Sequence, residues 1–284
     1  VEGVDVIILY PSGKVSSLQE NQLTTLGRNI TAVEVDGSFD DCQAMVKSAL
    51  AGSANRTNLK LTSANSINIA RLIPQSFYYY YAIGCSGNGR VLSVPSGNFG
   101  NITAAAMARR SGLGIDHLVA ATNVNRVVPD YLKTGIYAPA VSVATIANDM
   151  VLVNPGNFDR LRKVFDDAYG AITGSVSGYW FYDDRIREHI GQEYQRTGYL
   201  LDPHGAVASL GLDAYLEHHP GSGGIFVATA HPAKFRDILE PLTGQTVEIP
   251  DSLRNFLAGK KQSVKMKAGP QNIEEYLDDI YQNE

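Results

Sequence analysis

Short runs of apolar, largely β-branched residues alternate with helix-like segments along the chain, and this alternation limits the fold more than any other feature. Strands that alternate with helices in this way form parallel sheets, because each helix supplies the crossover between two strands. The sequence therefore predicts an α/β fold with mostly parallel sheets. Strands are expected at residues 6–10, 31–35, 91–95, 117–121 and 225–228, and helices near residues 17–26, 40–50, 68–81, 102–111 and 233–239.

The length and composition of the chain fit a folded protein with a sizeable core. It has 284 residues, of which 44% are apolar and 19% charged, so one large domain or two moderate ones are expected. The glycine-bearing segment 84–89 separates the first part of the chain from a renewed alternation of strands and helices. We therefore expect a smaller domain over residues 1–82 and a larger one over residues 83–284.

Charge and cysteine content exclude several classes of protein. The formal net charge of −5 gives no electrostatic reason to expect nucleic acid or an anionic membrane as a partner. Two cysteines are too few for a disulfide framework or a thiolate zinc site, so we expect no metal and a reducing, cytoplasmic location. The uncharged run 72–89 is too polar to span a membrane. The lysines near the C-terminal end are expected to form a solvated tail: Lys260, Lys261, Lys265 and Lys267.

The segment Ser96-Gly97-Asn98-Phe99-Gly100-Asn101 lies between an expected strand and an Ala-rich helix. Its glycines let the backbone approach a ligand, and the free N–H groups at a helix start attract an anion. The segment lacks the lysine of a P-loop and the G-x-G-x-x-G spacing of a dinucleotide site. The alternative is a βα turn that needs glycine only for its conformation. The asparagines favour a phosphate site.

A second polar segment, residues 63–71, places hydroxyl and amide groups before a helix and an arginine one or two turns later. Small hydrogen-bond donors together with a guanidinium suit an oxyanion such as phosphate or carboxylate. Spacing alone favours a simpler interpretation, in which a Ser or Asn N-cap is followed by a surface arginine.

Two further segments carry histidine. Thr229 and His231 follow the expected strand 225–228, and side chains at the carboxyl end of a parallel strand reach the ligand crevice. The same residues also fit an N-cap at Thr229 with Pro232 in the first turn of a helix. His204 and His231 are not at zinc-binding spacing. No G-x-S-x-G motif points to a hydrolase.

In chain order, these segments resemble the threonine synthase family, whose members are fold-type II (tryptophan synthase β-like) pyridoxal-phosphate (PLP) enzymes. The resemblance implies two αβ domains with mostly parallel sheets, PLP as the cofactor and O-phospho-L-homoserine as the substrate. The family converts this substrate and water to L-threonine and phosphate. The resembling segments are residues 14–16, 22–27, 36–42, 63–71, 95–101, 121–125, 142–148 and 229–235.

The resemblance also implies roles for individual residues. Both the substrate and the cofactor carry phosphate, so two oxyanion sites are needed. Thr229 is implied to hydrogen-bond to the pyridine nitrogen of PLP, where a neutral hydroxyl leaves that nitrogen nearer neutral than an acidic partner would. The implied cofactor contacts are Gly97, Asn98, Phe99, Gly100, Asn101 and Thr229, and the implied contacts of the substrate phosphate are Asn65, Ser66, Asn68 and Arg71.

One part of the family pattern does not occur in the sequence. The family holds PLP as a Schiff base on the lysine of a Phe-Lys-Asp segment, which lies upstream of a Ser-Gly-Asp-Thr-Gly loop, and neither segment is present. Lys234 lies near Thr229 but matches a structural position of the family. We therefore expect no catalytic residue in this chain. Because it opens abruptly at Val1, we also expect a fragment without the N-terminal portion and without activity by itself.

Two other functions stay open on the sequence alone. Another fold-type II enzyme, such as a threonine dehydratase or a cysteine synthase, shares the cofactor loop but lacks the phosphate-gripping segment 65–71. The other alternative is a non-catalytic homologue that binds phosphorylated metabolites and regulates a partner. The sequence does not indicate an oligomeric state.

Overall fold

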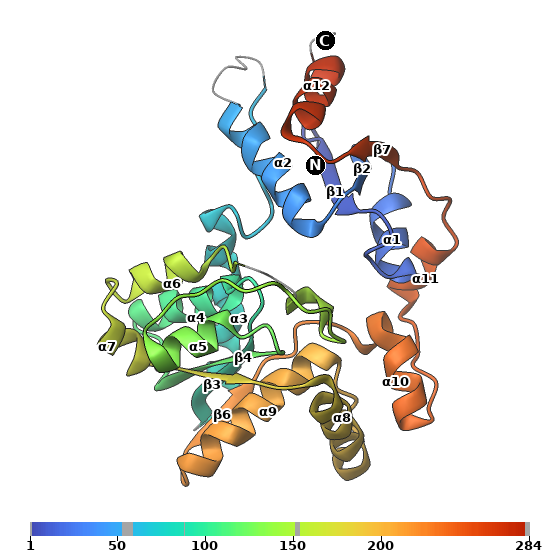
Figure 1. Ribbon diagram of the computed structural model, residues 1–284. Helices are drawn as coiled ribbons and strands as arrows, with labels where there is room; N and C mark the ends of the chain where they lie inside the picture. Colours follow the sequence, from blue (N-terminus) through green and yellow to red (C-terminus); the bar gives the residue numbers. More distant parts are fainter. Residues whose placement is uncertain (1, 53–58, 88, 151–153, 282–284) are drawn as a thin grey trace. The chain divides into compact units, whose positions relative to one another are not determined.

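A computed structural model describes residues 2–52, 59–87, 89–150 and 154–281. Contacts divide the chain into two units, and Figure 1 labels most of their helices and strands. Unit 1 comprises Val1–Ser63 and Glu248–Glu284, and unit 2 comprises Ala64–Val247. The boundary expected between residues 82 and 83 lies inside helix α3 (Leu72–Cys85), within unit 2. The C-terminal segment thus belongs to the same unit as the N-terminal one.

Unit 1 is built on a parallel three-stranded sheet in the order β1-β2-β7, formed by β1 (Val6–Pro11), β2 (Ile30–Asp36) and β7 (Val264–Lys267). Val33 and Val35 of β2 are fully buried with Met45 of α2 (Phe39–Gly52). Ile273 and Leu277 of α12 (Pro270–Tyr281) complete this core. Burial of these apolar side chains joins the two ends of the chain in one hydrophobic core.

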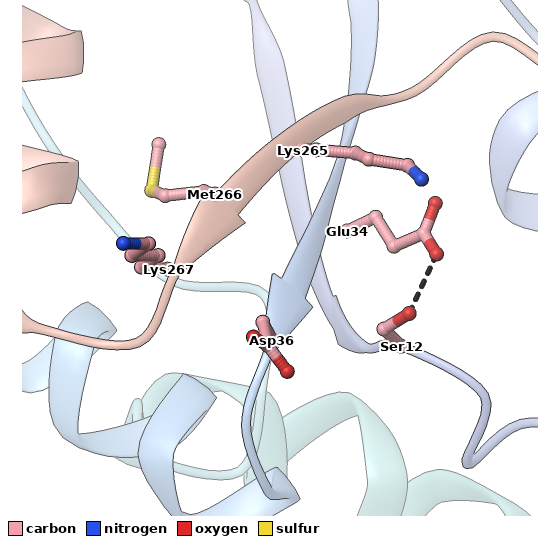
Figure 2. Close-up of a pocket in the computed structure, with 6 residues that line it drawn as sticks. All are labelled: Ser12, Glu34, Asp36, Lys265, Met266 and Lys267. Carbon is pink, nitrogen blue, oxygen red and sulfur yellow. Dashed lines mark hydrogen bonds between the residues drawn. The ribbon is translucent and has the colours of Figure 1, made fainter.

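The expected lysine tail is in part strand β7, although its lysines are exposed to solvent as predicted. Its lysines lie opposite acidic residues of β2, with Lys265 opposite Glu34 and Lys267 opposite Asp36. Opposite charges on facing strands stabilise the pairing. Together with Ser12 and Met266, these four residues line a depression of about 320 Å³ (Figure 2).

Lys261, just before β7, forms ion pairs with two carboxylates of the N-terminal segment. Its Nζ lies 2.6 Å from Glu20 Oε1 and 2.9 Å from Glu34 Oε2. Ser12 Oγ donates to Glu34 Oε1 at 2.7 Å, as Figure 2 shows. The hydrogen bonds from Ser12 and Lys261 lower the pKa of Glu34 to about 2, although burial opposes the shift. Glu34 is therefore an anion held by the sheet, with its charge balanced locally.

Unit 2 contains a second sheet in the order β5-β4-β3-β6, and every neighbouring pair in it is parallel. The prediction of an α/β fold with parallel sheets is thus confirmed. Leu92 and Val94 of β3 face a large core cluster, whereas Val91 faces Leu212 and Tyr215. The strands are β3 (Gly89–Pro95), β4 (His117–Thr122), β5 (Val176–Trp180) and β6 (Gly223–Phe226).

Helices cover both faces of this sheet (Figure 1). α9 (Pro203–His218) lies against one face so closely that a Cβ on Gly211 would come within 2.7 Å of Ala121 Cβ. The other face shares a core cluster with four helices: α3, α4 (Gly100–Arg110), α5 (Val127–Thr134) and α6 (Phe158–Val164). This alternation places the loops that follow the strands at one edge of the sheet.

The remaining helices are shorter or lie outside these layers. They are α1 (Ser17–Thr24), α7 (Tyr169–Thr173), α8 (Asp183–Thr197), α10 (Arg236–Thr243) and α11 (Asp251–Leu257), with 3₁₀ turns η2 (Ile69–Arg71), η3 (Asn148–Met150) and η4 (Pro232–Phe235). Among the described residues, no helix has both the length and the apolar character needed to cross a membrane.

Candidate phosphate-binding site

Two of the predicted site segments follow adjacent parallel strands of the unit 2 sheet. β3 pairs with β6, with Ser93 opposite Phe226, and the pairing ends where Val227 N donates to Ser93 O at 3.0 Å. Residues 96–101 follow β3, and Thr229 follows β6 with its side chain exposed. The carboxyl ends of both strands therefore point to one edge of the sheet, which is where open α/β sheets bind ligands.

The loop after β3 turns sharply into α4. Ser96 N donates to Ala121 O at 2.8 Å, which holds the loop to the end of β4. Phe99 has the left-handed φ of 60°, and its ring is buried with its centroid 6.1 Å from that of Phe158. Among the residues that the structure describes, none accepts a hydrogen bond from the N–H groups of Gly97, Asn98 or Phe99. Such a turn with free N–H groups at a helix start is an anion-binding geometry.

Gly97 lies directly against the backbone of η3. A Cβ added to Gly97 would come 2.5 Å from Asp149 O and 2.9 Å from Met150 Cα. Backbone atoms cannot yield as a flexible side chain can, so glycine is required here by close approach. The loop and η3 therefore fix one another's position.

The side chain of Asn98 joins the two predicted anion segments. Its Nδ2 donates to Ser66 Oγ at 2.9 Å, and its Oδ1 accepts from Gly156 N at 2.6 Å. Its carbonyl oxygen accepts from Asn157 N at 3.2 Å. Segments that are 32 residues apart in sequence are thus in direct contact. The side chain of Asn98 therefore holds the loop in place.

The segment 65–71 forms a compact polar turn beside that loop. Ser66 Oγ donates to Asn65 Oδ1 at 3.1 Å, and Asn68 Oδ1 accepts from Ala70 N at 3.0 Å, which caps η2. Arg71 is exposed, and its Nη1 donates to Ala64 O. The N-cap predicted from the spacing is therefore present, together with the cluster of donors on which a phosphate site depends.

Arg160, which the sequence analysis did not select, ties this turn to α6. Its Nη1 donates to Ser66 O and to Asn157 Oδ1, the latter at 2.7 Å, and its Nη2 donates to Ile67 O. Asn157 is 1% exposed and also holds the loop after β3. Residues 157–160 look like an ordinary helix start in the sequence. No local pattern therefore distinguishes Arg160 from an arginine that forms a surface ion pair.

The segment that follows β4 supports the site from a third side. Asn123 is fully buried, and its Nδ2 donates to Thr145 Oγ1 at 2.7 Å and to Ala147 O at 3.1 Å. Asn125 Nδ2 donates to Val143 O at 2.9 Å. These amides fix the chain that leads into η3, behind Gly97.

Other predicted side chains have structural roles in the described chain. His231, not Thr229, is the N-cap of η4, since its Nδ1 accepts from Ala233 N at 3.1 Å. Asn101 donates from Nδ2 to Pro95 O at 2.9 Å and accepts at Oδ1 from Ile102 N at 2.8 Å. The side chain of Asn101 is thus used within the loop after β3.

Comparison with known proteins decides the relationship. No family model matches the chain. It is 42% identical over 254 residues to threonine synthase of Escherichia coli strain K12, across 88% of this chain and 58% of that protein. The crystal structure of Escherichia coli threonine synthase matches 98% of this chain and 65% of that chain, with a TM-score of 0.89 and 38% identity. The chain is a homologue of threonine synthase.

Other solved structures agree with this relationship to threonine synthase. A PLP-bound threonine synthase from Brucella melitensis matches with a TM-score of 0.79 and 30% identity, over 97% of this chain and 65% of that one. Threonine deaminase isoform 2 from Solanum lycopersicum, at 16% identity and a TM-score of 0.53 over 84% of this chain and 69% of that chain, shares the fold alone. The fold-type II class predicted from the sequence is confirmed. The chain spans about 60% of the length of the curated relatives it matches.

Proposed function

We propose that this chain carries the two phosphate-binding segments of a threonine synthase, a PLP enzyme that converts O-phospho-L-homoserine and water to L-threonine and phosphate. The homologues support the activity, and the hydrogen bond between Asn98 and Ser66 is the observation that carries the site. It joins one segment suited to the phosphate of the cofactor to a second suited to the phosphate of the substrate. A phosphorylated cofactor with a phosphorylated substrate needs such a pair.

The loop after β3 fits the phosphate of PLP. The N–H groups of residues 97–99 have no acceptor in the described chain, and Gly97 is held against the backbone of Asp149 and Met150. The start of α4 adds the positive end of a helix dipole. Gly97, Asn98, Phe99, Gly100 and Asn101 would hold the phosphate through backbone N–H groups rather than through side chains.

The turn at residues 65–71 suits the phosphate of the substrate. Asn65, Ser66 and Asn68 bring hydroxyl and amide groups together, although the single Ser66 O–H donates to Asn65 Oδ1, and the Arg71 guanidinium presents several donors in a planar fork. Arg160 does not enter this set, since its donors are used on the carbonyls of Ser66 and Ile67. It orients the turn, and Arg71 supplies the charge.

The remaining chemistry divides between the cofactor and residues that act on protons. PLP, when bound, supplies an electron sink for the carbon atoms of the substrate. The Thr229 hydroxyl would hold the ring nitrogen without charging it. The family's Phe-Lys-Asp lysine is not among the lysines of this sequence. We therefore assign this chain the binding and orientation of both phosphates, and assign it no proton transfer.

Titration calorimetry with pyridoxine 5′-phosphate and with pyridoxine tests the cofactor part of this proposal. Neither compound has an aldehyde, so the surface lysines cannot react with them. The chain should bind the phosphorylated compound and not the other. Gly97→Val should abolish the heat, because the added side chain meets Asp149 O. Gly191→Ala in α8, where the added Cβ meets nothing within 4 Å, is the matched control and should bind normally.

The activity of the purified chain is the second test. It should form no threonine from O-phospho-L-homoserine and PLP, because the lysine of the family pattern is absent from its sequence. Threonine formation by the wild-type chain would contradict this assignment. Equal binding of pyridoxine and its phosphate would contradict the phosphate site itself.

A further inference from the structure

His204 is a buried histidine next to the site, and the proposed function does not use it. It lies at the start of α9 and is 3% exposed. Its Nδ1 is 3.1 Å from Asp202 Oδ1, and its Nε2 is 3.2 Å from the backbone nitrogen of Asp149. The imidazole therefore bridges the N-cap of α9 to η3.

The two partners fix the proton on the ring. A backbone N–H can only donate, so Nε2 must carry the lone pair that accepts from Asp149. The Asp202 carboxylate, which is 2% exposed, accepts the proton of Nδ1. The ring is then neutral, in the Nδ1–H tautomer. The other groups near it are Asp149 Oδ2, 3.8 Å from Nε2 on a 58% exposed side chain, and the Phe235 ring at 5.2 Å.

Asp149 connects the His204 bridge to the loop at residues 96–101. Its N–H is bound by His204, and its carbonyl oxygen lies 2.5 Å from where a Cβ of Gly97 would be. Asn123 fixes Ala147 O just before η3, and Asp183 Oδ2 accepts from Ile146 N at 3.1 Å. Those bonds hold the chain up to residue 147, and His204 alone among these side chains binds Asp149, whose carbonyl oxygen lies against Gly97.

We propose that His204 is a positioning residue for the loop at residues 96–101. As a neutral Nδ1–H imidazole it binds Asp202 and Asp149 at once, and Asp149 in turn lies against Gly97. The part of this inference that concerns phosphate affinity rests on the proposed function of residues 96–101. The part that concerns loop position does not. His204 touches neither the cofactor nor the substrate in this account.

Nitrogen-15 NMR of the histidine-labelled chain tests the tautomer directly. The wild-type chain should show His204 with a protonated Nδ1 and an unprotonated Nε2. Protonated Nε2, whether in the other tautomer or in the imidazolium, would overturn the proposal. This measurement uses the unmodified chain, so it decides even where a variant does not fold.

Two substitutions separate positioning from simple packing. In His204→Gln the carboxamide oxygen can take the place of Nε2 and accept from Asp149 N–H, whereas the shorter His204→Asn keeps only a donor toward Asp202. The amide resonances of residues 97–101 should shift in His204→Asn and change little in His204→Gln. Affinity for pyridoxine 5′-phosphate should fall about tenfold in the Asn variant and recover most of that loss in the Gln variant.

His189→Asn is the matched control. His189 is also buried, at 6% exposure, and its Nε2 lies 2.9 Å from Ser209 Oγ at the contact of α8 with α9. The His189→Asn substitution should leave the amide resonances of residues 97–101 unchanged. Equal shifts from the two Asn variants, or unchanged loop amides in His204→Asn, would overturn the proposal. If the wild-type chain does not bind pyridoxine 5′-phosphate, the proposed function fails, and the tautomer and loop amides still decide the role of His204.

Discussion

At the scale of single residues, the candidate site depends on backbone N–H groups and on a glycine that lies directly against the backbone of η3. Gly97 contacts the backbone of η3, and the side chains of Asn98 and Asn101 are used to hold the loop. The residue types that attracted attention in the sequence therefore build the site. Most of its direct contacts with a phosphate would come from the main chain.

Gly97→Ala should destabilise unit 2, because even a methyl group would lie 2.5 Å from Asp149 O and force the loop or η3 to move. A cost of about 1–3 kcal/mol is expected for such overpacking. Gly191→Ala, in the open part of α8, should instead stabilise by about 0.5–1 kcal/mol through helix propensity. Urea unfolding followed by Trp180 fluorescence measures both. Equal effects of the two substitutions would contradict the close approach at Gly97.

Arg160→Met should weaken ligand binding at the turn of residues 65–71 more than at the loop of residues 96–101. The substitution removes the donors to Ser66 O and Ile67 O, whereas the Asn98 bonds to Gly156 and Asn157 persist. Affinity for O-phospho-L-homoserine should fall about tenfold or more, since bonds to a charged donor are worth about 1.5–3 kcal/mol. Arg187→Met, on the exposed side of α8, is the control. A larger loss for pyridoxine 5′-phosphate than for the substrate would show that the assignment is reversed.

The residues of the site differ in how visible they are in the sequence. Residues 65–71 and 96–101 stand out because glycine, asparagine and hydroxyl residues cluster next to expected helix starts. Their contact through Asn98 and Ser66 is a tertiary contact that no local sequence pattern predicts. Arg160 and His204 are further from prediction, because each acts on backbone atoms of a segment distant in sequence.

At the scale of elements, local patterning predicts β1 to β4, β6 and helices near α1 to α4 and α10, whereas it gives no prediction for β5, α5 to α9, α11 and α12. The helical spacing over 68–81 becomes η2 followed by α3, because the Asn68 side chain caps a tight first turn. β7 escapes prediction because two of its four residues are lysines, and such a strand resembles a solvated segment. Its pairing depends on Glu34 and Asp36, which lie more than two hundred residues earlier.

The hydrogen bonds that Glu34 receives from Ser12 and Lys261 should make the stability of unit 1 depend on acid pH. The folded-state pKa of Glu34, about 2, lies below its ordinary value of 4.5. Its contribution is therefore complete above about pH 4.5 and is lost as pH falls toward 2. We expect a loss of about 2 kcal/mol, reduced by solvent because the Lys261 side chain is 41% exposed. Amide exchange of β2 between pH 5 and pH 2.5 measures it.

Glu34→Gln provides the control for that pH dependence. The variant keeps hydrogen-bonding capacity but has no charge, so exchange in β2 should vary less with pH than in the wild-type chain. Glu188→Gln on the surface of α8 in unit 2 should leave the slope unchanged. An unchanged slope in Glu34→Gln would show that other carboxylates carry the effect.

At the scale of the whole molecule, the chain folds as two units, and one of them is discontinuous in sequence. A linear reading finds a boundary where composition changes, near residues 82–89, and cannot see that residues 248–284 complete the first unit. The α/β class was predictable, since strand and helix alternate along the whole chain. The partition was not, because it depends on the burial of Ile273 and Leu277 with Val33 and Val35.

Removal of residues 248–284 should therefore unfold unit 1 selectively. The deletion takes away β7 and α12, and with them part of the core that covers β2. Amide protection in β1 and β2 should be lost. The urea transition of Trp180, the single tryptophan, reports on β5 in unit 2 and should change by less than about 1 kcal/mol. A cooperative loss of both signals would contradict the division into two units.

The most direct test of the central claim is an amide NMR titration of the 284-residue chain with O-phospho-L-homoserine, with L-homoserine as the matched ligand. We expect saturable shifts for amides of residues 65–71, spreading to Asn98 through its bond with Ser66, and no such shifts with L-homoserine. Identical responses to both ligands, or shifts confined to residues outside 65–71 and 96–101, would contradict the claim that this chain carries the phosphate-binding segments of a threonine synthase.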